Sequence, residues 1–401
     1  MVRPTVARVD LTAIQRNYRN IAAHLAAEAA ARPFDDARGR ADRALAPGLI
    51  AVVKANAYGH GAAQVARALE AAGADLLACA DIEEGATLRA AGVRAEILVF
   101  GALSVSDLDG VFDGRLTPTI STPGAARAVQ AAAAKYRQRL PYHLKIDTGM
   151  NRLGFRFDNL RRTLPGLLAS PNLELAAVYT HFATADDPES GLFERQRLRF
   201  ARALAEIDAM RGPGAPPLAA PAESLRPGRR PYVHACNSAA LLRDSRVWYD
   251  RVRPGLLMYG IVPPPMASTI EIAPAIGVHS RIVAVKGVRE GESAGYGAAF
   301  VAASPATIAI VPAGYADGLD LRLGGRGAVL IRGRRAPIVG SVCMDMLAAD
   351  VTGLDVSPGD EVVIIGAQGS DRIDVREIAA QIGTIPYEIL CRIGTRIERV
   401  Y

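Results

Sequence analysis

The sequence holds very little lysine and little that would cross-link it or anchor it in a membrane. Of 401 residues, 47 are lysine or arginine, but lysine stands only at Lys54, Lys135, Lys145 and Lys286. The four cysteines have neither the close pairing of a zinc site nor the density of a disulfide framework. No run approaches the roughly 20 apolar residues that span a bilayer, and the first thirty residues lack the apolar core of a secretory signal. We therefore expect a soluble cytoplasmic protein without a metal centre, in which any lysine chemistry has four candidates.

The basic charge of the chain does not indicate nucleic-acid binding. The formal net charge is +6 and the pI is about 9.2. The arginines are nevertheless scattered among 41 acidic residues, and aromatic residues make up 5% of the chain. Without a recognition motif or an aromatic platform, this charge predicts no nucleic-acid partner.

From about residue 48 to 262, short apolar runs alternate with amphipathic, alanine-rich stretches. This alternation is typical of βα units around a parallel sheet, and about eight such units would close a barrel. The apolar runs predict strands at residues 49–53, 76–80, 97–100, 142–146, 175–179 and 247–252. The stretches between them predict helices at 61–72, 87–91, 123–137 and 193–211. The fold class is therefore α/β, with an eight-stranded parallel barrel of the TIM type.

Beyond about residue 272 the pattern changes to short Val/Ile runs separated by Gly, Pro and Asp, at 281–288, 307–311, 328–331 and 361–365. This pattern predicts a compact, mainly β domain after a junction at 263–265. The first strand-like run, 5–9, precedes Asp10, a plausible N-cap for a helix from 11 to about 30, and we expect this run to pair with the C-terminal sheet. We assign 11–262 to the barrel and 272–401, with the N-terminal strand in 1–10, to the β domain. Residues 32–47 and 212–231 are predicted to be exposed insertions.

Lys54 directly follows the apolar run 49–53. In a parallel α/β barrel the functional groups lie where strands end and loops begin, so a lysine at this point faces the pocket. A desolvated lysine has a lowered pKa and can form a Schiff base. Position alone favours a solvated loop lysine over a functional one.

The string around Lys54, VVKANAYGHG, resembles the N-terminal signature of the alanine racemase family. Further motifs similar to those of the family follow in order: KIDTGMNRLGF at 145–155, THFATAD at 180–186, NSAA at 237–240, RPGLLMYG at 253–260, AGYGAAF at 294–300, GYADG at 314–318, SVCMDM at 341–346 and PYE at 386–388. The resemblance covers nearly the whole chain. It implies a barrel followed by a β domain, pyridoxal 5′-phosphate (PLP) as cofactor, and an isomerase that interconverts L- and D-alanine for peptidoglycan synthesis or alanine catabolism.

The resemblance assigns two catalytic bases. Lys54 matches the lysine that holds PLP and exchanges the Cα proton on one face of the substrate. Inversion needs a second group on the opposite face, and a tyrosine near positive charge can serve. Tyr296 matches this second base, although a tyrosine between glycines would otherwise be a turn residue that packs its ring. In the family this tyrosine reaches the active site of the other subunit, which implies a homodimer with shared active sites. Lys135 fits a solvated helix surface and Lys286 a structural position on a strand.

The resemblance also assigns the cofactor contacts. Arg253 is similar to the arginine that meets the PLP pyridine nitrogen. Arginine donates a hydrogen bond but effectively no proton, which weakens the electron sink and favours racemisation over transamination. His234 matches a residue that holds this arginine, with packing as the alternative, and His181 resembles the histidine that lies against the ring. The family's phosphate cradle is matched by the hydroxyls of Tyr58, Ser238 and Tyr387, by Asn237, and by the backbone of Gly255 and Leu256. The pair 237–238 alone would indicate a plain helix N-cap.

Arg152 resembles the arginine that binds the PLP 3′-oxygen and the substrate carboxylate. Some members of the family carbamylate the lysine that matches Lys145, which turns a cation into an anion that orients this arginine. The sequence retains the lysine and leaves the modification open.

Two loops of the β domain resemble the substrate contacts and entrance of the family. Met344, with its neighbours Cys343 and Asp345, matches the loop that donates a backbone hydrogen bond to the substrate carboxylate. Tyr315 and Tyr387 match the narrow entrance that admits alanine, with ordinary packing as the alternative.

Three other functions compete with alanine racemisation. A PLP-dependent decarboxylase of the same fold type would need its own cysteine and acidic pattern in place of AGYGAAF. A broad-specificity racemase usually carries an export signal, and a non-catalytic PLP-binding protein has the barrel without the β domain. The sequence favours alanine racemisation over all three.

Overall fold

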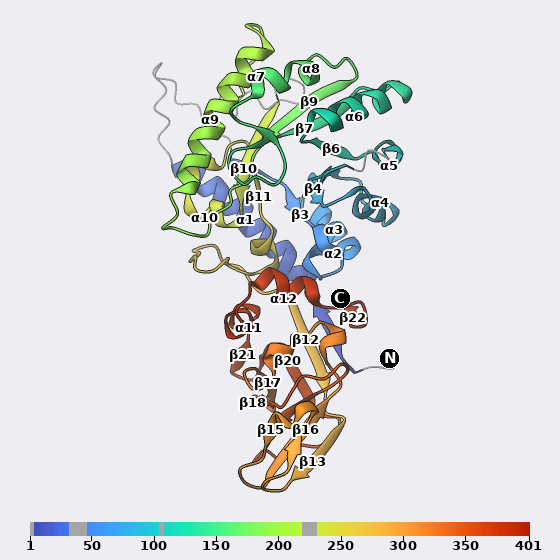
Figure 1. Ribbon diagram of the computed structural model, residues 1–401, viewed down its shortest axis with the longest axis vertical. Helices are drawn as coiled ribbons and strands as arrows, with labels where there is room; N and C mark the ends of the chain where they lie inside the picture. Colours follow the sequence, from blue (N-terminus) through green and yellow to red (C-terminus); the bar gives the residue numbers. More distant parts are fainter. Residues whose placement is uncertain (1–3, 32–45, 104–107, 219–230) are drawn as a thin grey trace. The chain divides into compact units, whose positions relative to one another are not determined.

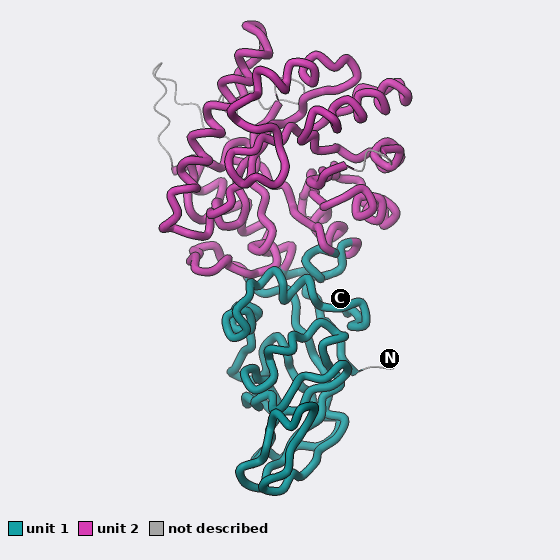
Figure 2. The backbone as a smooth tube through the Cα atoms, viewed as in Figure 1, with its two compact units in different colours: residues 1–13, 56–62, 273–401 teal, residues 14–55, 63–272 magenta. Residues whose placement is uncertain are grey.

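The computed structural model describes residues 4–31, 46–103, 108–218 and 231–401. The chain divides into two compact units, one formed by 1–13, 56–62 and 273–401 and the other by 14–55 and 63–272 (Figures 1 and 2). The stretch 56–62, just after Lys54, thus groups with the two ends of the chain. Of the predicted insertions, residues 32–45 and 219–230 lie outside the described residues.

The larger unit is built on a ring of parallel strands. These strands are β2 (Gly48–Leu49), β3 (Ala51–Val52), β4 (Leu76–Cys79), β5 (Glu96–Val99), β6 (Thr117–Ile120), β7 (Leu140–Asp147), β8 (Phe155–Arg156), β9 (Leu173–Tyr179), β10 (Tyr232–Asn237) and β11 (Arg251–Arg253). Their hydrogen-bonded order is β2-β11-β10-β9-β7-β6-β5-β4-β3, with all neighbours parallel and β8 paired to β7.

The ring closes because β2 and β3 are two parts of one extended stretch, separated only by Ile50. On one side the N–H of Gly48 donates to the carbonyl of Asp250, and on the other the N–H of Val53 donates to the carbonyl of Ala78. One stretch therefore bridges β11 and β4. The predicted eight-stranded parallel barrel is confirmed.

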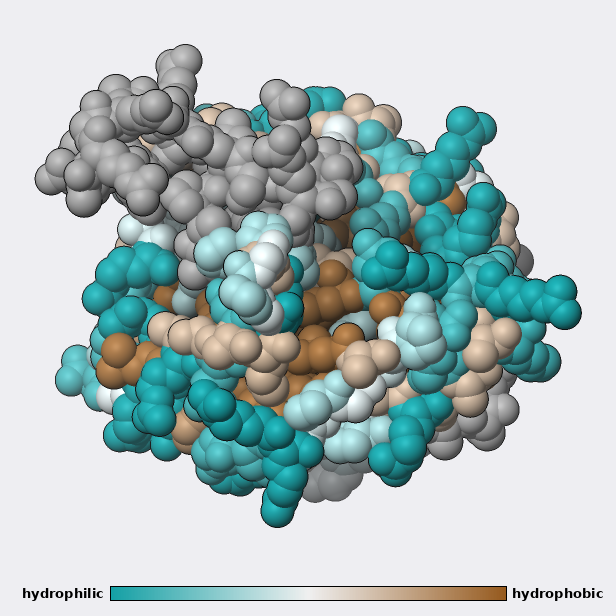
Figure 3. Space-filling model, turned by 90° about the horizontal axis from the view of Figure 1, so that it is seen from above, coloured by the Kyte–Doolittle hydropathy of each residue, from teal (hydrophilic) through white to brown (hydrophobic). Residues whose placement is uncertain are grey.

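Helices lie outside these strands (Figure 1). The helices of this part of the chain are α1 (Leu11–Ala31), α2 (Lys54–Tyr58), α3 (Ala62–Ala71), α4 (Ile82–Ala90), α5 (Asp109–Asp113), α6 (Pro123–Lys135), α7 (Leu160–Thr163), α8 (Pro165–Leu168), α9 (Leu192–Arg211) and α10 (Ser238–Arg243), with 3₁₀ turns η2 (Ser245–Val247) and η3 (Leu256–Tyr259). In α9, Phe193, Phe200, Leu204 and Ile207 are buried at the spacing of one helix face. Seen from above, hydrophobic residues gather near the centre of the molecule and hydrophilic residues around its rim (Figure 3).

The second unit is a mainly β domain, as predicted. Its strands are β1 (Val6–Val9), β12 (Ile276–Arg281), β13 (Ala284–Val288), β14 (Ser293–Ala294), β15 (Phe300–Val301), β16 (Ala306–Val311), β17 (Ala328–Ile331), β18 (Arg334–Val339), β19 (Leu347–Asp350), β20 (Glu361–Gln368), β21 (Asp371–Ile373) and β22 (Glu398–Val400). Its main sheet runs β13-β16-β19-β18-β17-β20-β12-β1-β22. Strand β1 pairs antiparallel with β12 and parallel with β22, which confirms that the N-terminal strand joins the C-terminal sheet. The N–H of Ala13 donates to the Asp10 side chain at 2.8 Å, so the predicted helix cap is confirmed as well.

Two predicted strands are corrected by the structure. The strand predicted at 247–252 is wrong over its first half, because Asp244 caps the turn η2 by accepting from the N–H of Arg246 at 2.9 Å. Tyr249 then has a φ of +49°, which an extended chain does not adopt, so β11 starts only at Arg251. The run predicted at 281–288 is two strands with different partners: β12 pairs with β1 and β20, and β13 pairs with β16.

The β domain also contains two helices that its Val/Ile pattern did not predict, α11 (Val375–Ile382) and α12 (Pro386–Arg392). Helix α11 begins at an Asp374 cap and ends at Gly383, which has a φ of +68°. These two residues are ordinary start and stop signals for a helix. Three 3₁₀ turns complete the unit: η4 (Tyr296–Ala298), η5 (Tyr315–Asp317) and η6 (Leu321–Leu323).

Within residues 4–31, 46–103, 108–218 and 231–401, no helix combines the length and the apolar character needed to cross a membrane.

Two loops of the β domain pack backbone against backbone at Gly314. The N–H groups of Tyr315 and Ala316 donate to the carbonyls of Cys343 and Met344, both at 3.0 Å. A Cβ atom at Gly314 would overlap these two carbonyl oxygens. Because the φ of Gly314 is −146°, the requirement for glycine is steric and not conformational.

We expect Gly314→Ala to lower the free energy of unfolding by about 1–3 kcal/mol, the usual cost of inserting a methyl group into a packed site. The matched control is Gly287→Ala in β13, where a Cβ meets nothing within 4 Å. Urea titrations of both variants check the prediction. Equal stability of the two variants would contradict it.

Candidate active site

The carboxyl ends of strands β10 and β11 bring Asn237, Ser238 and Gly255 together. The Asn237 side chain caps α10 by accepting from the N–H of Ala240 at 2.9 Å. The Ser238 hydroxyl, which is 2% exposed, accepts the N–H of Gly255 at 2.9 Å. The first N–H groups of α10 and η3 have no acceptor within their own helices. The backbone predicted to cradle phosphate thus forms one compact set of hydrogen-bond donors at the barrel end.

Arg253, the last residue of β11, is buried directly behind this set. Its Nη1 donates to Nδ1 of His234 at 2.7 Å. Its Nη2 donates to the carbonyls of Thr180 and Ala235, at 2.9 and 2.8 Å, and lies 3.2 Å from Nδ1 of His181. Burial lowers the pKa of Arg253 to about 10, so the group is still a cation at neutral pH. These contacts do not use Nε, which leaves that N–H for a ligand.

A tyrosine that sequence reasoning missed supports these residues. The Tyr179 ring stacks on His234, with centroids 4.6 Å apart and planes 10° apart. Lys145 Nζ lies 5.3 Å from the centroid of the same ring, and the Arg253 guanidinium 5.4 Å. The Tyr179 hydroxyl lies 3.0 Å from Oγ1 of Thr119. Its only sequence signal was its place at the end of the run 175–179, where an aromatic residue fits an ordinary core strand.

Lys54 begins a short segment of unusual backbone. The next four residues, 55–58, have φ between +52° and +53°, so α2 is a left-handed turn. Such a turn costs roughly 1–2 kcal/mol per residue, and strain of this kind gathers at functional sites. The Glu84 carboxylate holds the segment by accepting the N–H groups of Ala55 and Ala80, both at 2.7 Å. Glu84 was not predicted, because nothing in its helix distinguishes it from a surface glutamate.

Lys145 projects from β7 and is 6% exposed. Burial, together with the positive charges of Arg152, Arg253 and Lys54, lowers the pKa of Lys145 to about 8. Its amine is therefore partly neutral under ordinary conditions. The structure thus places Lys145 within the electrostatic reach of three other predicted site residues.

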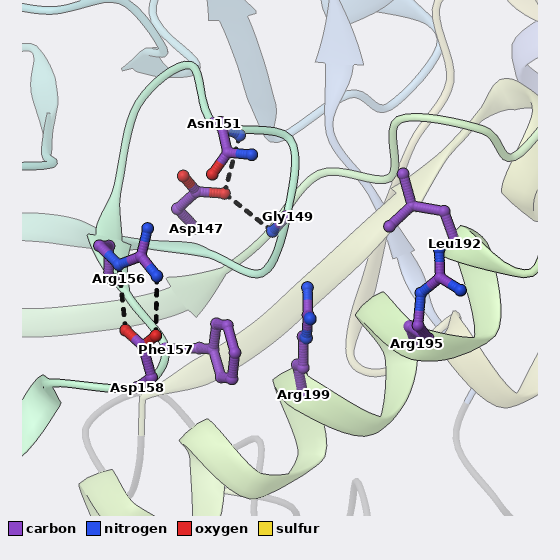
Figure 4. A pocket seen from close by; sticks show the side chains of 9 residues that line it. All are labelled: Asp147, Gly149, Asn151, Arg156, Phe157, Asp158, Leu192, Arg195 and Arg199. Atoms are coloured by element: carbon purple, nitrogen blue, oxygen red, sulfur yellow. Dashed lines mark hydrogen bonds and ion pairs between the residues drawn. The ribbon is translucent and has the colours of Figure 1, made fainter.

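Arg152 lies exposed on the loop between β7 and β8. The Asp147 side chain shapes this loop by accepting the N–H groups of Gly149 and Asn151, at 2.9 and 3.1 Å (Figure 4). Arg199 of α9 braces it by donating to the carbonyl of Thr148 at 3.1 Å. The loop and α9 line an open pocket of about 380 Å³.

Comparisons with known proteins match both units. A model of the alanine racemase N-terminal domain matches residues 29–263, and one of the C-terminal domain matches 275–401. The alanine racemase of Carboxydothermus hydrogenoformans is 38% identical over the whole of both chains, and that of Symbiobacterium thermophilum is 39% identical over all of this chain and 97% of its own. The chain belongs to the alanine racemase family.

Solved alanine racemases share its fold. The Bacillus anthracis enzyme with bound L-Ala-P matches with a TM-score of 0.85 at 33% identity, covering all of this chain and 95% of its own. The Bartonella henselae enzyme with covalently bound pyridoxal phosphate matches with a TM-score of 0.80 at 28% identity, covering 99% of each chain. Alanine racemases are PLP-dependent isomerases, and this family membership confirms the enzyme class and the cofactor.

The residues present in the barrel fit PLP. A phosphate requires several hydrogen-bond donors, and the Ser238 hydroxyl with the first N–H groups of α10 and η3 can supply them from adjacent strand ends. The buried guanidinium of Arg253 is held through Nη1 and Nη2, and its Nε–H is left for a ring nitrogen. Lys54 lies at the barrel end where a covalent link is required.

Other residues that match alanine racemase motifs lie in the second unit. The rings of Tyr58 and Tyr387 have centroids 5.9 Å apart. Tyr296 lies in η4 between Gly295 and Gly297, whose φ values are +79° and +72°, and is 77% exposed. Tyr296 is thus a turn residue whose ring does not pack within its own chain.

The predicted entrance and substrate loops also meet in this unit. Tyr315 is 42% exposed and Met344 is 52% exposed, and the hydrogen bonds described at Gly314 join their loops. Asp345 accepts from Nη2 of Arg396 at 2.6 Å, and Nε of Arg396 lies 3.5 Å from the buried Asp317 carboxylate. Arg396 was not predicted, since a lone arginine near the end of a chain carries no pattern of its own.

We propose that Lys145, whose amine is buried in the barrel 5.3 Å from the centroid of the Tyr179 ring, carries a carbamate. The neutral Nζ bonds the carbon of carbon dioxide and releases one proton to solvent. Because the neutral fraction rises as the pH passes through about 8, the yield should increase from pH 7 to pH 9. Native mass spectrometry in bicarbonate should show the mass of one added carbon dioxide in wild type and in Lys135→Gln, a control at an exposed helix position, but not in Lys145→Gln. An unchanged adduct in Lys145→Gln would refute the assignment.

Proposed function

We propose that this chain interconverts L- and D-alanine with PLP, in a homodimer whose subunits share their active sites. The observation that supports the proposal most strongly is the environment of Arg253, which is a buried cation. In the family the cofactor's ring nitrogen lies beside this arginine, which can donate a hydrogen bond to it but cannot accept one. A decarboxylase or transaminase benefits from a carboxylate at this position, which keeps the ring nitrogen protonated. Arginine favours proton exchange alone.

These residues would hold the cofactor. Ser238, Asn237 and the backbone at 255–256 would bind the phosphate, with the hydroxyls of Tyr58 and Tyr387. His181 would contact the pyridine ring, and Arg253 would donate to the ring nitrogen. When bound, PLP withdraws electrons from the bonds at the alanine Cα and so acidifies the Cα proton.

Substrate orientation falls to Arg152 and Met344. The Arg152 guanidinium binds the alanine carboxylate. Lys145 lies near enough to interact with Arg152 electrostatically. Met344 contributes a backbone N–H from the loop 343–345. Tyr315 and Tyr387 narrow the entrance so that larger side chains are rejected.

Two bases on opposite faces perform the inversion. The Lys54 amine takes or gives the Cα proton on one face, and the Tyr296 hydroxyl of the partner subunit does so on the other. The 77% exposure of Tyr296 in a single chain supports this arrangement, because a tyrosine that acts in a neighbouring subunit must project from its own. The barrel domain, 11–262, thus supplies most of the cofactor site, and the β domain, 272–401 with 1–10, supplies Tyr387 and the second base. The product serves peptidoglycan synthesis or alanine catabolism.

The first test measures the reaction and the role of Lys54. We expect purified protein supplied with PLP to show the visible absorption of a lysine-bound cofactor, to lose it on borohydride reduction, and to racemise alanine in both directions. Lys54→Ala should lose the absorption band and at least about 1,000-fold in kcat, because a covalent and proton-transfer group is removed. Lys286→Ala, at an exposed strand position, is the matched control. Racemisation of L-serine faster than that of alanine, or formation of a decarboxylation product faster than alanine racemisation, would overturn the substrate assignment.

The second test concerns the shared site. Lys54→Ala and Tyr296→Ala homodimers should both be inactive, and mixing them after reversible dissociation should restore activity. Random reassortment makes half of the dimers mixed, each with one intact site, so activity recovers to at most about a quarter of wild type. If each chain instead contained both of its own bases, no mixture would recover.

A further inference from the structure

A column of polar side chains fills the barrel interior behind Arg253. Its members are linked end to end: Nη1 of Arg253 lies 2.7 Å from Nδ1 of His234, Nε2 of His234 lies 3.2 Å from Nδ1 of His143, and Nε2 of His143 lies 2.7 Å from the Tyr232 hydroxyl. Both histidines are 0% exposed. Barrel interiors are usually filled by branched apolar residues, and a buried polar network is costly unless every member is satisfied. This column therefore requires an explanation.

The chemistry of arginine fixes the direction of every hydrogen bond in the column. A guanidinium has donors and no acceptor, so Nδ1 of His234 must accept. The proton of a neutral His234 is then on Nε2, from which it donates to Nδ1 of His143. By the same step His143 carries its proton on Nε2 and donates to the Tyr232 oxygen. Both histidines are thus confined to the Nε2–H tautomer.

The surrounding charges keep both rings neutral. Burial and the positive charges of Arg251 and Arg253 lower the pKa of His143 to about 3, and burial with Arg253 holds the pKa of His234 well below 6.5. At the far end of the column, the Arg251 guanidinium lies 5.4 Å from the centroid of the Tyr232 ring and pairs with Asp75 at 2.7 Å. The two histidines and Tyr232 are therefore neutral and lie between two cations, Arg253 and Arg251.

We infer that His143 and Tyr232 are positioning residues for racemisation, which hold His234 in the one tautomer that can accept from Arg253 and so keep Arg253 in its orientation. The inference rests on the proposed function, because the Nε–H of Arg253 is useful only toward a ring nitrogen. Neither residue touches substrate or cofactor in this account. Their effect is to make the arginine a donor of constant charge and orientation.

The Tyr232 hydroxyl, at the end of the column away from Arg253, is needed to keep the tautomers of both histidines. Without it, Nε2–H of His143 loses its acceptor, at a cost comparable to an unsatisfied buried donor. His143 can relieve this cost by moving its proton to Nδ1, but that proton would then face the Nε2–H of His234. Two N–H groups would then face each other, so His234 would have to move or change its tautomer. Either change would weaken its 2.7 Å hydrogen bond with Arg253.

The test is the tautomeric state of the histidines in holoenzyme labelled with ¹⁵N-histidine, measured by solid-state NMR. The six histidines of the chain are assigned by single substitutions. In wild type, His143 and His234 should both show a protonated Nε2 and a bare Nδ1. Tyr232→Phe should add a second tautomer at His143 and lower kcat roughly three- to tenfold, with KM for alanine unchanged.

Two further variants separate positioning from packing. Tyr142→Phe removes another buried tyrosine hydroxyl, one outside the column, and should change neither tautomers nor kcat. His143→Gln can still accept at one end and donate at the other, so it should retain most of the activity that His143→Leu loses.

The inference is overturned if either histidine in wild type carries its proton on Nδ1, or if Tyr232→Phe lowers thermal stability while tautomers and kcat stay as in wild type. Failure of the proposed function is a distinct result, since it would appear as wild-type protein that does not racemise alanine, whatever its histidine spectrum.

Discussion

The burial of one guanidinium is the constraint on which the barrel site depends. Taking a cation out of water is costly, and Arg253 offsets that cost by donating to backbone carbonyls and imidazole nitrogens on the neighbouring strands. An arginine offers no acceptor, so each partner must present one. The tautomer of His234 is consequently set by the neighbouring Arg253 and not by the pH of the solvent.

The same constraint explains the aromatic support around the site. The flat face of Tyr179 lies against His234 and near the cations of Arg253 and Lys145, so one ring limits the movement of three polar groups. An apolar side chain in its place would fill the volume but would offer no π-face to the positive charges. Positions that look like ordinary core in the sequence are thus chosen for their electrostatic properties.

The sequence predicted the barrel and much of the site because those features are local. A strand followed by the small polar pair Asn237 and Ser238 can be recognised in the sequence, and Asn237 caps the helix as that pattern predicts. The left-handed turn after Lys54 was not predictable, because a hydrogen bond to Glu84, 30 residues further along the chain, helps to hold it. The column through His143 was missed for the same reason: its partners come from different strands and meet only when the barrel closes. Helices α11 and α12 were overlooked although their caps are local, since the Val/Ile runs around them dominated the pattern.

The lysines and arginines of this site have different tasks. Of 47 basic residues only four are lysine, yet two of the four, Lys54 and Lys145, act on each other electrostatically within the barrel. Arginine keeps its charge under nearly all conditions, whereas the pKa of a lysine falls readily when it is buried near other cations. Arg253 and Arg152 are placed where a constant charge is needed, and the lysines where an amine must be able to lose its proton. Arginine can replace lysine on the surface without loss of activity. Inside the barrel the same exchange would remove the amines that can lose a proton.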